Sequence, residues 1–134
     1  MDNRYNRHNR RKYSLKVHIV LVCKYRKQLL KGSIADDVKQ KIFDIANTRG
    51  YEIFAMETDK DHIHFLLSYD TTNRVCDIVK AVKKETTYYL WQKYNPFLLK
   101  QYYKKKIFWS DGYFACSIGE VSSATIQKYI ESQG

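Results

Sequence analysis

The run from Asp59 to Leu67 constrains the fold most, because histidines alternate in it with apolar residues. In a β-strand, residues i and i+2 point to the same face. His62 and His64 would therefore stand side by side on one face, while the apolar residues around them bury the other. At about 3.3 Å per residue their backbones are roughly 7 Å apart, so both imidazoles could reach one metal ion. Paired surface or core histidines are the competing interpretation of so short a motif.

A chain of 134 residues forms one domain that buries roughly two thirds of its unfolded surface. The three cysteines, Cys23, Cys76 and Cys116, form no Cys-x-x-Cys pair, which predicts small core residues in a reducing compartment. No apolar run is long enough to span a bilayer, and the N-terminus lacks the apolar stretch of a signal peptide. We therefore expect a soluble cytoplasmic protein with no membrane partner.

Basic residues exceed acidic ones by 24 to 14, which gives a formal net charge of +10. This excess favours a polyanionic partner, with nucleic acid as the first candidate. Residues 1–12 form a basic N-terminal arm that contains Arg10 and Arg11, and residues 13–134 form the single domain. The arm either follows phosphates or is a solvated tail.

Hydrophobic periodicity predicts the order of strands and helices. Strands are expected at 13–23, 51–58, 62–69, near 107–109 and at 113–118. Helices are expected from Ser33 to Gly50, from about 73 to 95 where Asn95-Pro96 ends the helix, and after Ser122. This order predicts an α+β fold, a ferredoxin-like split βαβ antiparallel sheet with two helices on one face. The histidine face is then left for a C-terminal helix or a ligand.

The predicted helix at 73–95 carries a basic stripe opposite its apolar stripe. Lys80, Lys84 and Trp91 lie on this stripe at helical spacing, which predicts an exposed indole beside two cations. Such a face suits contacts with phosphates and a stacked base. The candidate DNA-binding residues are Arg10, Arg11, Lys24, Arg26, Lys80, Lys84, Trp91, Lys104 and Lys105.

The last predicted helix holds Tyr129 and Gln133 one turn apart, about 6 Å between Cβ atoms. A divalent ion held by His62, His64 and the Gln133 carboxamide could polarise a phosphate while Tyr129 attacks it. A partly buried helix tyrosine and a solvated amide are the alternative interpretation. Gly119 separates this helix from the preceding strand, so the helix could dock on its own sheet or on a partner's.

Several blocks carry a family resemblance in chain order. They are Tyr13–Val20 with Cys23–Arg26, Thr58–Leu67, Trp109–Phe114, Ser117–Gly119 and Tyr129–Gln133. Together they resemble the single-tyrosine HUH transposases of the TnpA type, which move small insertion sequences as single-stranded DNA. The resemblance covers nearly the whole chain.

The resemblance implies a metal-dependent transposase that cleaves and rejoins single-stranded DNA. It implies that His62, His64 and Gln133 hold Mg²⁺ or Mn²⁺ and that Tyr129 forms a 5′-phosphotyrosine link. It also implies a homodimer that binds DNA hairpins and shares its active sites between chains. Two alternatives remain open: a non-catalytic single-stranded nucleic-acid-binding domain of RNA-recognition-like fold, and an HUH relaxase or replication initiator.

Overall fold

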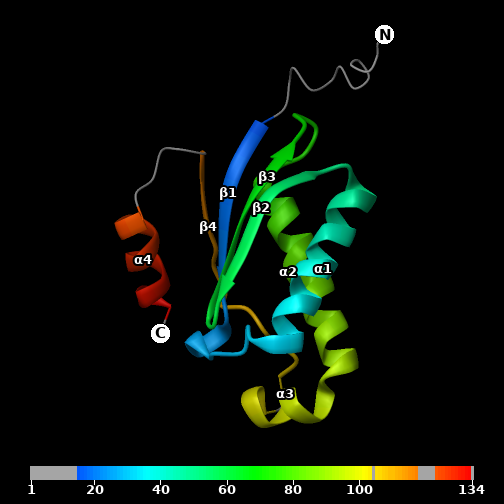
Figure 1. Cartoon of the computed structure of the whole chain (residues 1–134), viewed down its shortest axis with the longest axis vertical. Coiled ribbons are helices and arrows are strands. Elements are labelled where there is room, and N and C mark those ends of the chain that lie inside the picture. Colours follow the sequence, from blue (N-terminus) through cyan, green and yellow to red (C-terminus); the bar gives the residue numbers. More distant parts are fainter. Residues whose placement is uncertain (1–14, 104, 118–122, 134) are drawn as a thin grey trace.

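The computed structural model describes residues 15–103, 105–117 and 123–133, which form one antiparallel sheet with helices on both faces (Figure 1). The strands are β1 (Leu15–Val22), β2 (Glu52–Asp59), β3 (His62–Tyr69) and β4 (Phe114–Ser117). They lie in the order β2-β3-β1-β4, and every neighbouring pair is antiparallel. The predicted ferredoxin-like α+β fold is thus confirmed.

The helices form two unequal layers. They are α1 (Gly32–Arg49), α2 (Val75–Lys93), α3 (Asn95–Tyr102) and α4 (Ser123–Ser132). Helices α1 and α2 cover one face of the sheet, and α4 lies on the other (Figure 1). None of the helices described is both long and apolar enough to cross a membrane.

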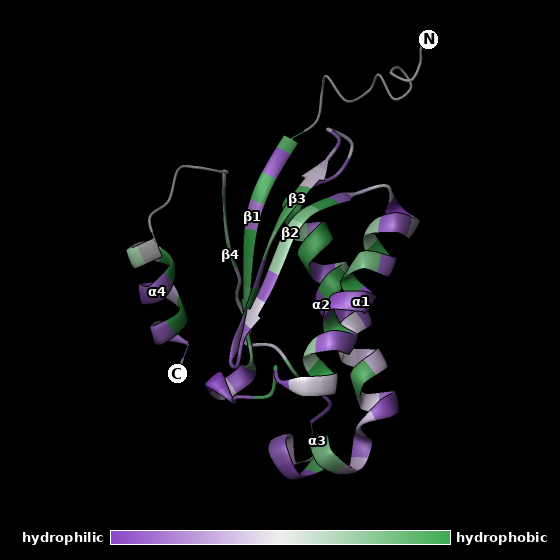
Figure 2. Cartoon of the chain, in the orientation of Figure 1, coloured by the Kyte–Doolittle hydropathy of each residue, from purple (hydrophilic) through white to green (hydrophobic). Residues whose placement is uncertain are grey.

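The larger core lies between the sheet and α1 and α2. Ile63, Phe65 and Leu67 of β3 are at most 1% exposed, and they pack with Ile19 and Leu21 of β1. In Figure 2, polar and apolar residues alternate in the first half of β1, whereas the second half is apolar throughout and buried on both faces. The opposite face carries a much smaller cluster of Val20, Val22 and Ile130, which attaches α4 to its own sheet. Phe114, Ile126 and Tyr129 are partly buried against this cluster.

Some predicted bounds hold and others do not. The histidine strand spans 62–69 as predicted, and α1 ends at Gly50, whose φ of 82° favours glycine. However, α1 begins at Gly32, so Ser33 does not cap it, and the predicted cap Ser122 lies outside the described residues. The long helix ends just before Asn95-Pro96 as predicted, but Pro96 occupies the first turn of α3, a helix that was not predicted. Proline suits that position because the first helical turn needs no N–H donor from it.

Two further predictions were wrong in part. The segment near 107–109 is no strand, since it contributes only an isolated bridge between Cys23 and Trp109. Of the cysteines predicted to be core residues, only Cys23 is buried, while Cys76 is exposed and Cys116 is half-buried. Cys76 lies in the first turn of α2, where a small residue need not face the sheet.

Candidate active site on the open face of the sheet

The two histidines of β3 lie on the face opposite the large core. His62 pairs with Val22 and His64 with Val20, both of which belong to the small cluster under α4. The imidazole rings are stacked, with centroids 6.1 Å apart and planes inclined by 27°. The alternation in the sequence thus places them as expected.

Asp61, in the turn between β2 and β3, orients His62. The His62 Nδ1 lies 2.9 Å from Asp61 Oδ1, and the other carboxylate oxygen accepts from Arg26 Nε at 3.3 Å. The turn is also fixed by backbone bonds, because the Cys23 and Leu30 amides donate to the carbonyls of Asp61 and Lys60. When Nδ1–H donates to a carboxylate, Nε2 of the same ring is left with a free lone pair.

His64 lies between a histidine and a carboxylate. Its Nδ1 is 3.3 Å from His18 Nε2, and its Nε2 is 3.8 Å from Glu57 Oε1. Burial and the neighbouring His62 lower the pKa of His64, and Glu57 opposes this shift. Burial and His64 likewise lower the pKa of His18. The two rings therefore favour the neutral form, which is the form that binds a metal ion.

Tyr129 lies over the β4 side of the same face. Its ring centroid is 5.6 Å from that of Phe114, and a Cβ on Gly112 would lie 3.5 Å from its hydroxyl. Within the described part of the chain, the buried hydroxyls of Tyr129 and Ser110 make no hydrogen bond. Burial raises the pKa of Tyr129. The phenol therefore keeps its proton at neutral pH.

A row across three strands relates the tyrosine to the histidines. Val20 of β1 pairs with His64 on one side and with Phe114 on the other. Since neighbouring strands lie about 4.8 Å apart, β3 and β4 are separated by about 10 Å. The two halves of the candidate site share one face, and among the described residues no hydrogen bond joins the Tyr129 hydroxyl to either histidine.

In the described part of the chain, Gln133, the predicted third metal ligand, bonds to its neighbour Ser132 rather than to the two histidines. The Gln133 side-chain amide donates to Ser132 Oγ at 3.0 Å, and no hydrogen bond joins it to either histidine among the described residues. The same residues contain no cluster of three or more histidine, cysteine or carboxylate side chains suited to a metal ion. The structure therefore brings His62 and His64 together without a third such ligand.

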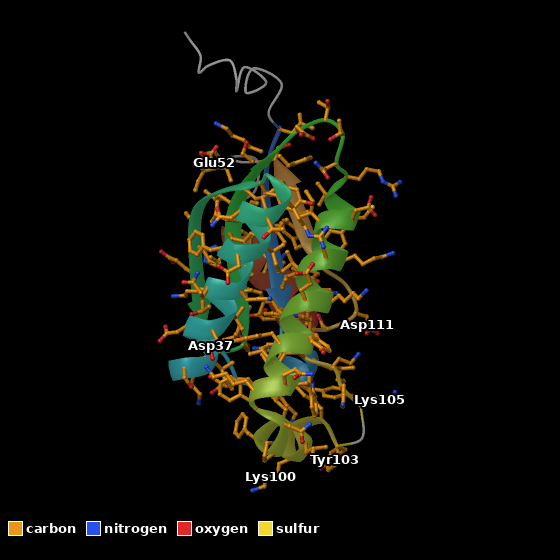
Figure 3. All side chains as sticks on the ribbon, turned by 90° about the vertical axis from the view of Figure 1, so that its right-hand side faces the viewer. Asp37, Glu52, Lys100, Tyr103, Lys105 and Asp111 are labelled. Atoms are coloured by element: carbon orange, nitrogen blue, oxygen red, sulfur yellow. The ribbon has the colours of Figure 1, made fainter. Side chains whose placement is uncertain are left out.

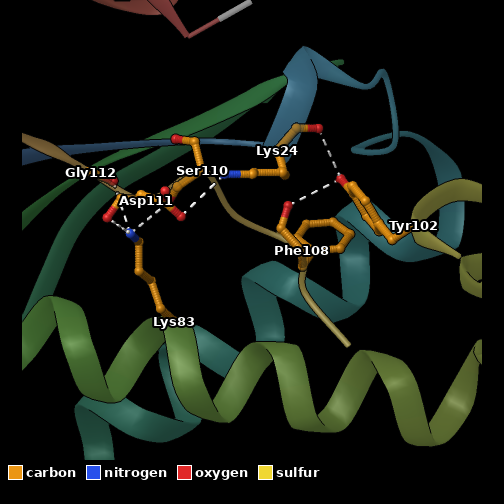
Figure 4. A network of polar contacts seen from close by, with 7 residues as sticks. All are labelled: Lys24, Lys83, Tyr102, Phe108, Ser110, Asp111 and Gly112. Carbon is orange, nitrogen blue, oxygen red and sulfur yellow. Dashed lines mark hydrogen bonds and ion pairs between the residues drawn. The ribbon is translucent and has the colours of Figure 1, made fainter. Parts of the chain in front are cut away.

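The segment under Tyr129 is held by α2 (Figure 4). Lys83 Nζ donates to the carbonyls of Ser110 at 2.7 Å, Asp111 at 3.0 Å and Gly112 at 2.9 Å. Lys24 adds an ion pair with Asp111 at 3.2 Å. Burial lowers the pKa of Lys83, and Asp111 opposes this shift. A half-buried cation thus fixes three successive carbonyls beside the tyrosine.

Trp91 corrects the prediction of an exposed indole. Its side chain is 4% exposed and its Nε1 donates to the Ile107 carbonyl at 2.9 Å. The chain between α3 and β4 crosses this side of α2 and covers the ring, which periodicity within one helix does not foresee. Tyr88, 68% exposed, is the accessible aromatic residue nearby.

The other candidate DNA-binding residues fall into four groups. Lys80 and Lys84 line a groove of about 790 Å³ with Tyr88, between α2 and residues 106–111. Lys24 and Arg26 are engaged with carboxylates. Lys105 is exposed at the same end of the molecule as Lys100 and Tyr103 (Figure 3). Arg10, Arg11 and Lys104 lie outside the described residues.

His18 is the site residue that sequence reasoning missed. The alternation of residues 15–22 already put its side chain on the face opposite Ile19 and Leu21. The missing information was the register, because only the pairing of β1 with β3 brings His18 beside His64.

Comparisons with known proteins identify similar sequences. Residues 11–133 match the family described as Transposase IS200 like. The ISDra2 transposase TnpA of Deinococcus radiodurans is 37% identical over 121 residues, which are 90% of this chain and 85% of the relative. An IS200 transposase of Salmonella typhimurium is 29% identical over 122 residues, 91% of this chain and 78% of the relative.

Solved structures show the same fold. A crystal structure of a candidate transposase from Deinococcus radiodurans R1 superposes with a TM-score of 0.82 at 32% identity, covering 90% of this chain and 92% of that one. A REP-associated tyrosine transposase, solved bound to a REP hairpin, superposes with a TM-score of 0.58 at 14% identity, covering 87% and 62%. The second likeness concerns the fold alone. The extent of the family match and the identity to the relative from Deinococcus place this chain in the IS200-like transposase family.

Proposed function

We propose that this transposase cleaves and rejoins single-stranded DNA through a 5′-phosphotyrosine intermediate on Tyr129, at sites marked by DNA hairpins of an insertion sequence. The observation that carries the proposal is the pair of stacked imidazoles on the sheet face that α4 also covers. Tyr129 of α4 contacts Phe114, which lies at the opposite end of the His64–Val20–Phe114 row from His64.

In the cleavage step, the Tyr129 oxygen attacks the scissile phosphorus. The new bond joins phosphorus to the tyrosine oxygen, and the bond from phosphorus to the 3′ oxygen breaks. The phenol loses its proton and the departing 3′ oxygen gains one, so charge and atoms balance. Rejoining is the reverse, with a 3′-hydroxyl attacking the phosphotyrosine. Burial raises the pKa of Tyr129, so the resting phenol is protonated and needs a group that accepts its proton when it attacks.

His62 and His64 fit a divalent ion. The Nδ1 of His62 lies beside Asp61 and the Nδ1 of His64 lies beside His18, so the Nε2 of each ring is the nitrogen that could bind the ion. A bound Mg²⁺ or Mn²⁺ would polarise the scissile phosphate, and nitrogen ligands favour Mn²⁺ by affinity. We propose Gln133 as a further ligand that α4 brings to the histidines when the site closes.

We propose a homodimer with shared sites. Among the described residues the Tyr129 hydroxyl makes no hydrogen bond to a histidine of its own chain, so the tyrosine of a partner could complete the site instead. Co-expression of His64→Ala with Tyr129→Phe tests the shared site. Purified mixed dimers should regain about half of the wild-type cleavage, because one of two sites is then intact. No recovery in demonstrated heterodimers would reject sharing and leave the chemistry standing.

Covalent capture tests the proposed reaction. Single-stranded DNA with an end hairpin of the element is incubated with protein and Mn²⁺, and adducts are separated by denaturing electrophoresis. We expect an adduct that EDTA abolishes. Hairpin binding without any adduct would instead indicate a non-catalytic binding domain. An adduct formed equally with DNA that lacks the hairpin would refute hairpin recognition and leave the proposed chemistry standing.

A further inference from the structure

We propose that His18 is a positioning residue for His64, with the role toward that ring that Asp61 has toward His62. The inference rests on the proposed function, because it concerns how His64 presents itself to a metal ion. His18 lies on β1, two residues before Val20, the residue that pairs with His64. Its Nε2 is 3.3 Å from His64 Nδ1, and the ring centroids are 5.3 Å apart.

The direction of this contact decides whether His64 can bind a metal ion. A neutral imidazole carries one proton, on either Nδ1 or Nε2. If His64 donates Nδ1–H to His18 Nε2, its own Nε2 has a free lone pair. If His18 is the donor instead, the proton of His64 sits on Nε2 and faces Glu57, 3.8 Å away. Only the first arrangement offers Nε2 to a metal ion.

At 3.8 Å, Glu57 is too far from His64 Nε2 for a hydrogen bond that would hold a proton there, and the neighbouring histidine has the first arrangement. His62 already has Nδ1 beside a carboxylate that only accepts, which leaves its Nε2 free. With His18 as acceptor, both rings present the same nitrogen from the same face. Partners that hold the second nitrogen of a metal-binding histidine fix its tautomer and ring orientation. His18 would then be neutral, with its single proton on Nδ1.

Mn²⁺ affinity, measured by titration calorimetry without DNA, tests the role of His18. His18→Phe keeps a ring but has no acceptor, and we expect binding to weaken about 10- to 100-fold. His18→Gln keeps an acceptor and should restore most of the affinity. Lys16→Ala, on the same face of β1 and away from the pair, is the matched control. Wild-type affinity in a folded His18→Phe variant would overturn the inference.

The tautomer of His64 gives a second measurement that needs neither metal nor a variant. Long-range ¹H–¹⁵N spectra of the metal-free wild type should show the proton of His64 on Nδ1. A proton on Nε2 would overturn the inference, even where His18→Phe does not fold. Wild-type protein that binds no Mn²⁺ would refute the metal role in the proposed function, and with it any positioning for metal. Equal binding by wild type and His18→Phe refutes the role of His18 alone.

Discussion

The histidine strand and the tyrosine helix are attached to the fold in different ways. β3 is bonded along its length to β1 and β2, and its apolar side chains lie in the larger core. α4 rests on the opposite face through Ile130 on Val20 and Val22, with a few partly buried neighbours. The proposed metal-binding half is therefore part of the rigid scaffold, whereas the proposed nucleophile is carried by an element with little buried surface. Segments of that kind open with the smallest free energies.

The largest expected effect is that of Tyr129→Phe, which should remove the reaction without loosening α4 from the sheet. Tyr129→Phe should abolish the covalent adduct, because the hydroxyl is the proposed nucleophile. Stability should be unchanged or rise by up to about 1 kcal/mol, since the buried hydroxyl has no described partner to lose. Adduct yield and the thermal midpoint are measured together, with Tyr113→Phe as the control. An adduct formed by the Tyr129→Phe variant would identify another nucleophile.

Truncating one apolar side chain on each face tests the difference in attachment. Phe65→Ala should reduce the free energy of unfolding by about 3–5 kcal/mol, because it opens a cavity in the larger core. Ile130→Ala should cost at most about 2 kcal/mol, near the low end for such truncations, and the loss should be confined to α4. Hydrogen exchange should then accelerate in α4 and not in β3. Equal acceleration in both elements would contradict the comparison.

Substitution of Lys83 tests whether α2 stabilises residues 110–112, the segment next to Tyr129. Lys83→Met removes three hydrogen bonds from a charged donor, and we expect a loss of about 2 kcal/mol. The exposed Lys84, next in sequence, gives the control Lys84→Met, which should change stability by less than about 0.5 kcal/mol. Equilibrium unfolding in urea measures both. Indistinguishable variants would show that these bonds do not hold the segment.

Substitutions in the groove beside α2 should weaken DNA binding without changing the fold. Replacing Lys80 and Lys84 with Gln removes two cations that line it. If both contact phosphates, the slope of log affinity against log salt should become shallower by about 1.5. The control is the double change of Lys39 and Lys41 on α1. An unchanged slope would show that Lys80 and Lys84 do not contact phosphates.

The smallest expected effect lies on the helices over the larger core. Asp37 of α1 accepts from the Tyr94 hydroxyl and pairs with Lys93 at 2.9 Å, which lowers the pKa of the carboxyl. Its stabilisation is complete above the ordinary pKa of 3.8 and is lost as the pH falls through the lower folded value. Asp37→Asn should cost less than about 1 kcal/mol at pH 6, because the pair is partly exposed. The gap between the thermal midpoints should narrow as the pH falls below 3.8; a gap that stays constant there would exclude the ion pair as its cause.

Sequence patterns predicted what depends on local alternation and missed what depends on pairing. The bounds of β3 and the face of its histidines follow from period-two alternation over one strand. The contact of His18 with His64 depends on the register between β1 and β3, to which the chain contributes residues 46 positions apart. The burial of Trp91 depends on a segment that returns across α2 after α3. Helical periodicity describes one element at a time and contains no information on such crossings.

Asp61 has a consequence for how sequences of this fold can diverge. Its two carboxylate oxygens serve different segments, Oδ1 for His62 and Oδ2 for Arg26. An asparagine at this position would replace one of the two oxygens with an NH2 donor, so in the observed arrangement either the histidine or the arginine would face another donor. Substitutions at positions 26 and 61 should therefore occur together among homologues, and an alignment should show covariation between two sites that are 35 residues apart in the chain.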